Sequence, residues 1–481
     1  MARLSERVVR GTLVTMGRRT AGALAVVALL ASACGAKTGL LVAQSMRDAG
    51  AGGGMTSRDA GGWMDGARVA DGEAGARDGA AESGAPLRDG AVVRVDGSST
   101  VLDGAADVLG PVAGVAAGAE HTCVWRTTGQ VQCWGRNDFG QAGTSASTPT
   151  VTAPVFVPGV RAVQMALGSR HTCALDADGA VACWGLNTWG MLGTAEPDQT
   201  ERPQRVPGLP PIARLTAGWS HTCALAVGGE VYCWGKNDGG QIGIGTTADQ
   251  HRPVRVASLD TAVDVTAGRS HTCAVTVDGV VYCWGGNAAG QLGFGTDGIA
   301  VLPLAVPGLG PMVVVRAGEA STCAVGSDGR LQCWGALGRT LLYCALPCPI
   351  GPCGGDGGTD DAHPFVAFAG HVDAIEVGRA HGCLVDATRA LRCWGDSDRR
   401  QLGFRPTVNC DGSSCSGYGS CPFAPPTAVD GITSVASMAV GYDHSCAVDD
   451  RHFVYCWGDN TRAQTGSAGD VVSVPTRVMG I

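Results

Sequence analysis

The sequence predicts an all-β fold, a seven-bladed β-propeller built of four-stranded blades. A segment containing Cys-Trp-Gly recurs seven times after residue 112, and the first five copies are spaced by 50 residues. Such a period is typical of solenoids and propellers. Alternating and β-branched residues punctuated by Gly, Pro, Asn and Asp indicate four short strands per repeat, and no helical pattern of useful length is present.

The third copy shows how we place the strands and the ring closure. Its strands are expected at Gln204–Val206, Ala213–Ala217, His221–Ala226 and Glu230–Trp234. A strand containing proline precedes each later copy, the first copy has none, and Pro475-Thr476-Arg477-Val478-Met479-Gly480 ends the chain. We therefore expect the C-terminal strand to complete the first blade and to close the ring.

The N-terminus predicts export and a lipid anchor. Five arginines between Arg3 and Arg19 precede the apolar stretch Ala21–Ala31, which suits a signal peptide and is too short to span a bilayer comfortably. The run Leu30-Ala31-Ser32-Ala33-Cys34-Gly35 resembles the lipobox of bacterial lipoproteins, which implies a lipoprotein signal peptide over residues 1–33 and lipidation of Cys34. The alternative is an ordinary signal peptide that leaves Cys34 as an odd thiol.

The same resemblance implies an address. Gly35 rather than Asp follows the cysteine, so we expect the bacterial cell envelope, at the outer membrane or the cell surface. Residues 34–111 are rich in Gly, Ala and Asp and have almost no aromatic or β-branched clusters, which predicts a disordered linker. The propeller then covers residues 112–481.

Two cysteines ten positions apart flank a three-residue turn in each repeat, as at Ala177-Asp178-Gly179. Gly suits the left-handed last position of such a turn, and the resulting register places Cys173 opposite Cys183 at about 4.5 Å between Cα atoms. A disulfide is therefore sterically allowed. The predicted pairs are Cys123–Cys133, Cys173–Cys183, Cys223–Cys233, Cys273–Cys283, Cys323–Cys333, Cys383–Cys393 and Cys446–Cys456. A metal site is disfavoured because this spacing lacks clustered ligands.

The segment Asn237-Asp238-Gly239-Gly240-Gln241-Ile242-Gly243, which follows Cys233-Trp234-Gly235, resembles the regulator of chromosome condensation (alpha-tubulin suppressor-like) repeat family. The match covers residues 112 to 481 and implies a seven-bladed propeller. The family's cytoplasmic members generally lack the paired cysteines, which implies an exported variant. The guanine nucleotide exchange of the founding member is not expected, because an exported protein would not meet a cytoplasmic small GTPase.

Histidine occupies one repeat position in six copies, with Ser321 in the fifth. A side chain repeated around a ring is typical of a structural ladder, and its copies lie too far apart to share one ion, so we expect hydrogen bonds to turns or neighbouring blades and no metal or cofactor. The recurring tryptophans are expected to pack between blades. These residues are His121, His171, His221, His271, His381 and His444, and Trp134, Trp184, Trp234, Trp284, Trp334, Trp394 and Trp457.

The fifth and sixth copies depart from the repeat through insertions at 336–363 and 404–425. Both follow the Trp-Gly strand, so we expect them on one face of the ring. They contain Cys344, Cys348 and Cys353, and Cys410, Cys415 and Cys421. One bridge inside each insertion and one between them is the economical pairing, a metal site is a weaker alternative, and the partners stay open. Tyr343, Tyr418 and Phe423 are candidate aromatic anchors for a partner.

The sequence favours binding over catalysis. A formal net charge of −8 with scattered Lys and Arg argues against nucleic acid as a partner. Because no nucleophile elbow, Walker loop or HExxH motif is present, no catalytic residue is predicted. We expect a membrane-anchored extracytoplasmic scaffold that recognises a protein or glycan. The alternative is a hydrolase or lyase whose composite site lies on one face.

Overall fold

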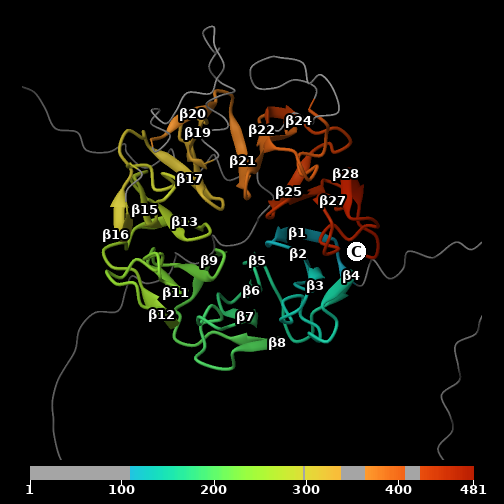
Figure 1. Cartoon of the computed structure of the whole chain (residues 1–481), viewed down its shortest axis with the longest axis horizontal. Helices are drawn as coiled ribbons and strands as arrows, with labels where there is room; N and C mark the ends of the chain where they lie inside the picture. Colours follow the sequence, from blue (N-terminus) through green and yellow to red (C-terminus); the bar gives the residue numbers. More distant parts are fainter. Residues whose placement is uncertain (1–108, 296–297, 337–362, 407–422) are drawn as a thin grey trace, which may run out of the picture. The chain divides into compact units, whose positions relative to one another are not determined.

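A computed structural model of the chain describes residues 109–295, 298–336, 363–406 and 423–481. These residues form seven sheets, each of four antiparallel strands, and the sheets surround a central axis as the blades of a propeller (Figure 1). The predicted all-β, seven-bladed fold is confirmed. Within the described residues, no helix is long and apolar enough to cross a membrane.

Each blade uses four consecutive strands of the chain. Blades one to three comprise β1 Val112–Ala117, β2 His121–Arg126, β3 Val131–Arg136 and β4 Thr150–Phe156; β5 Gln164–Leu167, β6 His171–Leu175, β7 Val181–Leu186 and β8 Gln199–Arg205; and β9 Ile212–Ala217, β10 His221–Ala226, β11 Val231–Gly235 and β12 Gln250–Arg255. Blades four and five comprise β13 Ala262–Ala267, β14 His271–Thr276, β15 Val281–Gly286 and β16 Ile299–Ala305; and β17 Met312–Ala317, β18 Ser321–Gly326, β19 Leu331–Gly335 and β20 Phe365–Phe368. Blades six and seven comprise β21 Val372–Val377, β22 His381–Asp386, β23 Leu391–Asp396 and β24 Phe423–Ala428; and β25 Val435–Val440, β26 His444–Asp449, β27 Val454–Asp459 and β28 Val471–Arg477.

The expected ring closure is wrong. The C-terminal strand β28 pairs with β27 in its own blade, and the first blade is completed by β4, which pairs with β3. The strand containing proline thus belongs to the hairpin before it, so the segment Gln204–Val206 that we assigned to the third blade overlaps β8 of the second blade.

A side chain in the connecting loop explains this allocation. Asn137 follows β3, and its Nδ2 donates to the carbonyl oxygens of Ser145 and Thr148 at 2.9 Å each. Its Oδ1 accepts a hydrogen bond from the backbone N of Ala142 at 2.9 Å. These bonds fold the loop back, so the chain returns antiparallel beside the strand it has just left. Consecutive strands usually pair in this way.

The ring closes through side contacts between complete blades. Thr122 in the first blade hydrogen-bonds the Nε2 of His444 in the seventh at 2.9 Å. The indole of Trp134 donates to the carbonyl of Gln464 at 2.9 Å, and Gln132 reaches the carbonyl of Gly480 at 3.2 Å. The first two contacts recur between other blades, so closure uses the ordinary blade-to-blade contact.

The second and third strands of every blade are joined by a disulfide. Cys173 lies opposite Cys183 as the sequence register placed it, and the seven described bonds have Cα separations of 4.0 to 4.1 Å. The turn before Cys183 contains Gly179 with a φ of 80°, and a Cβ there would lie 2.9 Å from the backbone N of Ile212. Local turn geometry and the contact with the next blade therefore both require glycine.

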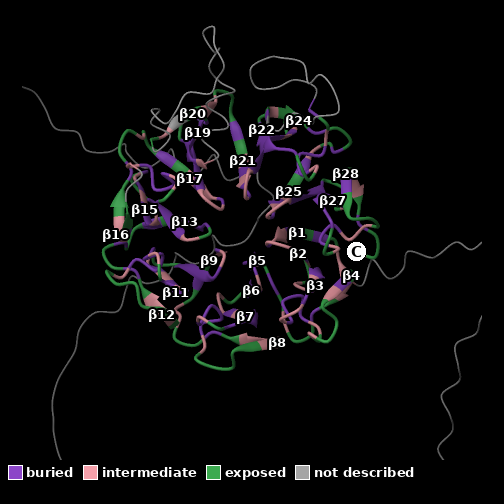
Figure 2. Ribbon diagram, in the orientation of Figure 1, coloured by how far each residue is buried: buried purple, intermediate pink, exposed green. Residues whose placement is uncertain are grey.

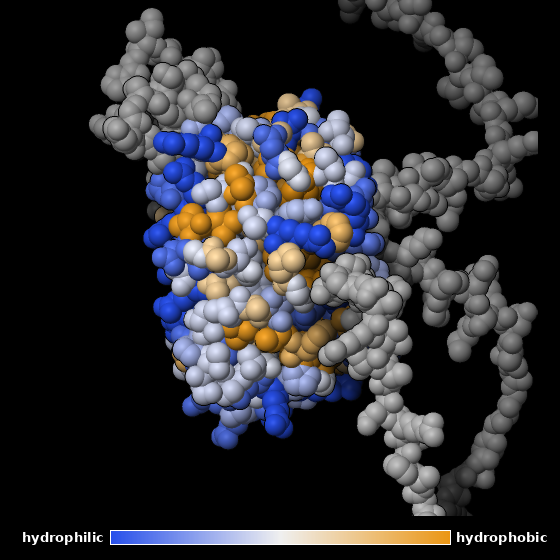
Figure 3. Space-filling model, turned by 90° about the vertical axis from the view of Figure 1, so that its right-hand side faces the viewer, coloured by the Kyte–Doolittle hydropathy of each residue, from blue (hydrophilic) through white to orange (hydrophobic). Residues whose placement is uncertain are grey.

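The core lies on the inner strands and between blades. Figure 2 shows buried residues concentrated on these strands, with exposed residues on the outer strands and loops. The large apolar clusters combine residues from adjacent blades, because Trp284 of the fourth blade packs in the same cluster as Ile242 of the third. On the side that carries β4 and β28, apolar surface is interspersed with hydrophilic side chains (Figure 3).

Replacing Cys273 and Cys283 together by alanine removes one hairpin disulfide. We expect the free energy of unfolding to fall by about 2.5 to 3 kcal/mol, because an eleven-residue loop in the unfolded chain is released. The turn still sets the register, so the circular dichroism spectrum should keep its β character. Urea unfolding measures the loss, and a double variant with an unchanged midpoint would contradict this role of the bond.

Candidate functional site

The turns between the first and second strands form the mouth of the central channel. In each blade a glycine precedes the channel-facing turn residue, and a Cβ at Gly168 would lie 2.1 Å from Cε1 of His171. The glycine is therefore sterically required, whereas the next residue is free to vary. These seven mouth residues are Ala119, Ser169, Trp219, Arg269, Glu319, Arg379 and Tyr442, and they line a hollow of about 110 Å³.

Two aromatic mouth residues meet across the channel. Trp219 comes from the turn before β10 and Tyr442 from the turn before β26, so their blades lie on different sides of the ring. Their ring centroids are 5.2 Å apart with an interplanar angle of 60°. Such an edge-to-face pair contributes roughly 0.5 to 1.5 kcal/mol beyond area burial. The pair therefore fixes the position of both rings over the channel.

Cationic side chains cover these rings. The guanidinium of Arg269 lies 5.2 Å from the centroid of Trp219, and that of Arg379 lies 4.9 Å from the centroid of Tyr442. Arg269 also forms an ion pair with Glu319, and Arg379 pairs with Asp443 at 2.8 Å. Each arginine thus connects one blade to the next while it orients an aromatic ring.

The environment keeps the phenol of Tyr442 protonated. Burial and the adjacent carboxylate of Glu319, which accepts a hydrogen bond from the hydroxyl, raise the pKa of Tyr442 to about 12. Burial also raises the pKa of Asp443, and Arg379 opposes that rise. Tyr442 is therefore a hydrogen-bond donor and a packing surface at neutral pH, and no nucleophile is generated in this way.

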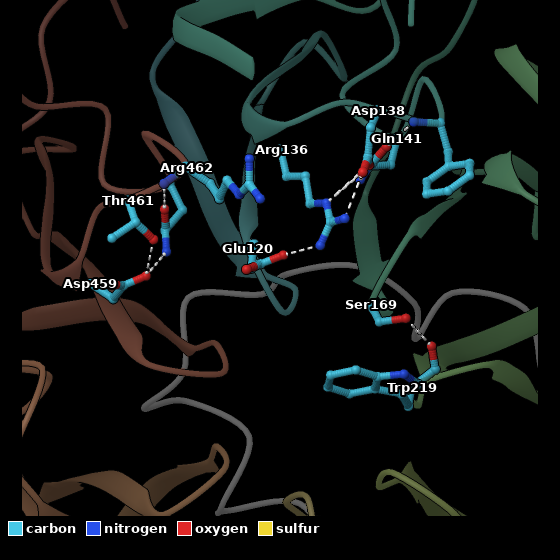
Figure 4. A network of polar contacts seen from close by, with 11 residues as sticks. Glu120, Arg136, Asp138, Gln141, Ser169, Trp219, Asp459, Thr461 and Arg462 are labelled. Atoms are coloured by element: carbon cyan, nitrogen blue, oxygen red, sulfur yellow. Dashed lines mark hydrogen bonds and ion pairs between the residues drawn. The ribbon is translucent and has the colours of Figure 1, made fainter. Parts of the chain in front are cut away.

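Polar contacts beside the mouth hold the turns in place (Figure 4). Arg136 bonds Asp138 through Nε at 2.9 Å and forms an ion pair with Glu120, while Nε2 of Gln141 donates to Asp138 at 3.1 Å. Burial disfavours ionised Asp138, but the bonds from Arg136 and Gln141 outweigh it and lower its pKa. The carboxylate of Asp138 therefore serves to hold these turns together.

The same face carries more aromatic rings farther from the axis. Phe139 lies in the loop after β3 and is covered by Arg170 at 5.1 Å, and Trp189 lies in the loop after β7 and is covered by Lys236 at 5.2 Å. Loops of this kind join the third and fourth strands of a blade. The insertions at 336–363 and 404–425 interrupt the same connection in the fifth and sixth blades, so the strands that flank them end at the mouth face.

Charged side chains line the channel beneath the mouth. The lumen, a cavity of about 360 Å³, is lined by Arg214, Arg316 and Glu376, and the buried carboxylate of Asp264 on β13 lies between the two arginines. Asp264 forms ion pairs with Arg214 at 3.2 Å and with Arg316 at 2.8 Å, and Arg316 also pairs with Glu376 at 3.1 Å. Burial raises the pKa of Glu376, and Arg316 opposes that rise. The four charges thus form one chain of opposite partners.

Comparison with known proteins places this architecture in a family. A family model described as RCC1-like domain matches residues 70–342, and a regulator of chromosome condensation (RCC1) repeat matches residues 435–464. The chain belongs to the RCC1-like domain family. No curated protein matches the sequence significantly.

Two solved structures are similar to this RCC1-like propeller. Yeast RCC1 (Prp20) bound to Kap60 shares 23% identity, with 77% of this chain and 84% of that chain covered and a TM-score of 0.63. Prp20p from Saccharomyces cerevisiae, described with its binding to Gsp1p and histones, shares 23% identity, with 77% and 87% covered and a TM-score of 0.61. Identity at this level shows the propeller fold alone.

The repeated histidines of the RCC1-like propeller connect neighbouring blades, as the repeat pattern predicted. All six are fully buried, and Nε2 bonds a Thr or Ser hydroxyl of the next blade at 2.8 to 3.0 Å. Burial lowers the pKa of each of them, to about 4 for His271 and to about 3 for the others. They are therefore neutral. Across the described ranges, no group of three or more His, Cys, Asp or Glu could hold a metal ion.

Several predicted site residues lie outside the described residues. These are Cys34, Tyr343, Tyr418 and the insertion cysteines Cys344, Cys348, Cys353, Cys410, Cys415 and Cys421. Phe423 begins β24, where its backbone pairs with Asp396. Our sequence reasoning missed Trp219, Arg269 and Tyr442. In the sequence they occupy a repeat position that varies between copies, although the Gly before it and the His two residues after it recur.

The buried histidines predict a loss of stability in acid. Unfolded histidines bind protons near pH 6.5, whereas the folded ones stay neutral until about pH 3 or 4, so the unfolded state takes up more protons in that window. Stability should be full above pH 6.5 and should fall below it, by at most about 1.4 kcal/mol per pH unit for each histidine. Urea unfolding at a series of pH values measures the slope.

His221→Gln is the matched control for this prediction. It removes one titrating group, so its slope between about pH 4 and 6 should be smaller by up to 1.4 kcal/mol per pH unit. Identical slopes for the variant and the parent protein would exclude the histidine ladder as the source of the acid sensitivity.

Proposed function

We propose that this RCC1-like propeller is a lipid-anchored, extracytoplasmic binding scaffold whose mouth face recognises a protein partner. The observation that carries the proposal is the variation at the seven mouth positions, which hold six residue types, each placed directly after a glycine that recurs in every blade. Variation confined to loops on a rigid frame is typical of recognition surfaces.

The chemistry of the mouth favours a protein over a glycan. Trp, Tyr and Arg dominate the contacts that contribute most to protein interfaces, and all three types meet at Trp219, Tyr442 and Arg269. A sugar ring stacks on an open aromatic face, and the cation over each ring, together with the edge-to-face contact between the rings, leaves less of that surface free. If the partner is a glycan instead, the crosslinking experiment below will show a carbohydrate adduct.

The frame is suited to binding because its turns are fixed before a partner arrives. The hairpins carry disulfides, the turn glycines are sterically required, and the Ser169 hydroxyl holds the backbone carbonyl of Trp219 at 2.6 Å. Less conformational entropy is then lost on association. The similar yeast propellers are described with the protein partners Kap60, Gsp1p and histones, which supports protein binding as a use of this fold.

The anchor is proposed from the N-terminal sequence. The order of basic, apolar and small residues ending at Cys34 indicates a lipoprotein, and residues 34–111 would separate the propeller from the membrane. The mouth face would then be presented in the bacterial envelope or at the cell surface. A nucleotide exchange function would need a cytoplasmic GTPase and is not part of the proposal.

Cys34→Ser tests the anchor. Without the thiol no acyl chain can be attached, so metabolic labelling with a fatty acid should disappear and the protein should leave the membrane fraction. Cys273→Ser is the control, because it removes a cysteine that lies in a hairpin disulfide and should keep the label. Unchanged labelling of the Cys34 variant would refute the lipid anchor.

A photoreactive amino acid at Ala119 tests the binding face in whole cells. Ala119 lies at the mouth, whereas Val277 lies on a hairpin turn at the opposite end of the fourth blade and is 73% exposed. We expect a discrete protein adduct from position 119 and none from position 277. A carbohydrate adduct at position 119 would replace the protein partner by a glycan, and adducts from position 277 alone would place recognition on the other face.

Affinity measurements with the purified partner complete the test. Trp219→Ala should weaken binding at least tenfold, since central aromatic residues typically contribute more than about 1.4 kcal/mol to an interface. Val277→Ala should leave the dissociation constant unchanged. Equal affinities for both variants would show that the mouth does not bind the partner.

A further inference from the structure

Six of the seven seams between adjacent blades share the same two side-chain bonds. In the first bond, histidine Nε2 meets a Thr or Ser hydroxyl of the next blade; in the second, a Trp indole donates to a backbone carbonyl of the preceding blade. The histidine bonds are His121–Thr172, His171–Thr222, His221–Thr272, His271–Thr322, His381–Ser445 and His444–Thr122. The indole bonds are Trp184–Gln141, Trp234–Met191, Trp284–Gln241, Trp334–Gln291, Trp457–Gln401 and Trp134–Gln464.

The seam between the fifth and sixth blades lacks the histidine bond because both partners have changed. Ser321 replaces the histidine, and Gly382 stands where the other blades have Thr or Ser. Ser321 is fully buried, and its hydroxyl has no hydrogen-bond partner among the described residues. Gly382 offers no hydroxyl at all, so the paired loss removes the link completely.

The same seam lacks the indole bond. Trp394 is fully buried, and its Nε1 has no partner within the described part of the chain. A Cβ at Gly382 would lie 2.5 Å from Cζ2 of Trp394, so the indole occupies the space of the missing side chain. An unpaired buried donor costs about 1 to 3 kcal/mol.

Three described polar contacts still join these blades, and one of them, from the backbone N of Val372 to the carbonyl of Gly329 at 3.0 Å, lies at the end away from the mouth. The backbone N of Glu319 donates to the carbonyl of Gly378 at 3.1 Å, at the mouth. In the lumen, Arg316 pairs with Glu376 at 3.1 Å. Glu376 is the last member of the lumen charge chain, whereas Arg316 keeps a second partner in Asp264. Among the described residues, the seam therefore has one side-chain clamp where the other six have the two repeated bonds.

We propose that the propeller opens first at the seam between the fifth and sixth blades, and that the Arg316–Glu376 ion pair is the clamp that holds it shut. Opening there separates Glu319 on the fifth blade from Arg379 and Tyr442 on the sixth and seventh. It would therefore rearrange the mouth, including the hydrogen bond from Tyr442 to Glu319. That consequence for binding rests on the proposed function, whereas the opening itself is measured without a partner.

Hydrogen exchange of the full chain under native conditions tests the seam. The amide of Glu319 bonds across the fifth seam, and the amide of Trp219 makes the equivalent bond, to Gly268 at 3.3 Å, across the third. After correction for intrinsic rates, we expect the amide of Glu319 to be protected roughly tenfold less than that of Trp219, as local opening requires. Equal protection of the two amides would overturn the proposal.

Glu376→Met tests the clamp, and Arg214→Met is its matched control. Both remove one lumen ion pair, but the third seam keeps the bonds His221–Thr272 and Trp284–Gln241. The Glu376 variant should lose roughly another tenfold in protection at the amide of Glu319, whereas Arg214→Met should leave the amide of Trp219 unchanged. If both variants lose the same amount of amide protection, the Arg316–Glu376 pair has no special role.

A third test restores the missing histidine–hydroxyl pair instead of removing a contact. Ser321→His combined with Gly382→Thr recreates the histidine bond and should raise protection at the amide of Glu319 to the level of Trp219. Gly382→Thr alone should not, because it displaces Trp394 as the double variant does but provides no histidine for the new hydroxyl. A double variant that folds with unrestored protection would show that the missing bond does not govern the opening.

Discussion

The buried link between adjacent blades is the interaction on which the rest of this structure depends. Complete blades with no shared strand can form a ring only if each seam is tight and polar groups at the seams are satisfied. The histidine Nε2 with its hydroxyl partner, and the tryptophan Nε1 with its carbonyl partner, are satisfied in this way at 0% to 1% exposure, whereas Nδ1 of each histidine has no partner among the described residues. Each link requires glycine beside the histidine, since a Cβ at Gly218 would lie 2.4 Å from Cε1 of His221. One contact thus accounts for most of the sequence repeat.

Because the link between blades recurs with little change, the variation between blades is concentrated at the mouth. The residue after the required glycine has its side chain at the channel mouth and outside the buried histidine and tryptophan link, so it is free to differ between blades. Aromatic and charged residues use this freedom at Trp219, Arg269, Glu319, Arg379 and Tyr442. Their contacts run between blades, and the mouth is consequently coupled to the geometry of the seams beneath it.

The ring is chemically asymmetric in one region. Within the described parts of the chain, the fifth seam lacks both repeated bonds, and the connections that carry the two insertions belong to the blades on either side of it. The lumen charge chain runs through the same half of the ring and ends at Glu376. A propeller of equal seams would resist opening uniformly, whereas unequal seams give the molecule a preferred place to open, next to residues of the mouth.

The sequence alone determined what short-range geometry decides. The spacing of the cysteines around a three-residue turn sets the register Cys173–Cys183, and the number of copies sets seven blades. Both follow from contacts between residues close in the chain. The position of the disulfide is likewise a local consequence of the hairpin, so one sequence was sufficient to place it.

Only the tertiary structure decided the allocation of strands and the composition of the mouth. A strand between two hairpins can pair with either of them, and the choice depends on a loop folded by Asn137. Trp219 and Tyr442 are far apart in the chain, and their contact exists only because the ring brings different blades to one axis. The paired change at Ser321 and Gly382 is visible in the sequence, yet its meaning depends on knowing that these positions face each other. Long-range pairing is set by packing of the whole ring, which residue patterns within one repeat do not encode.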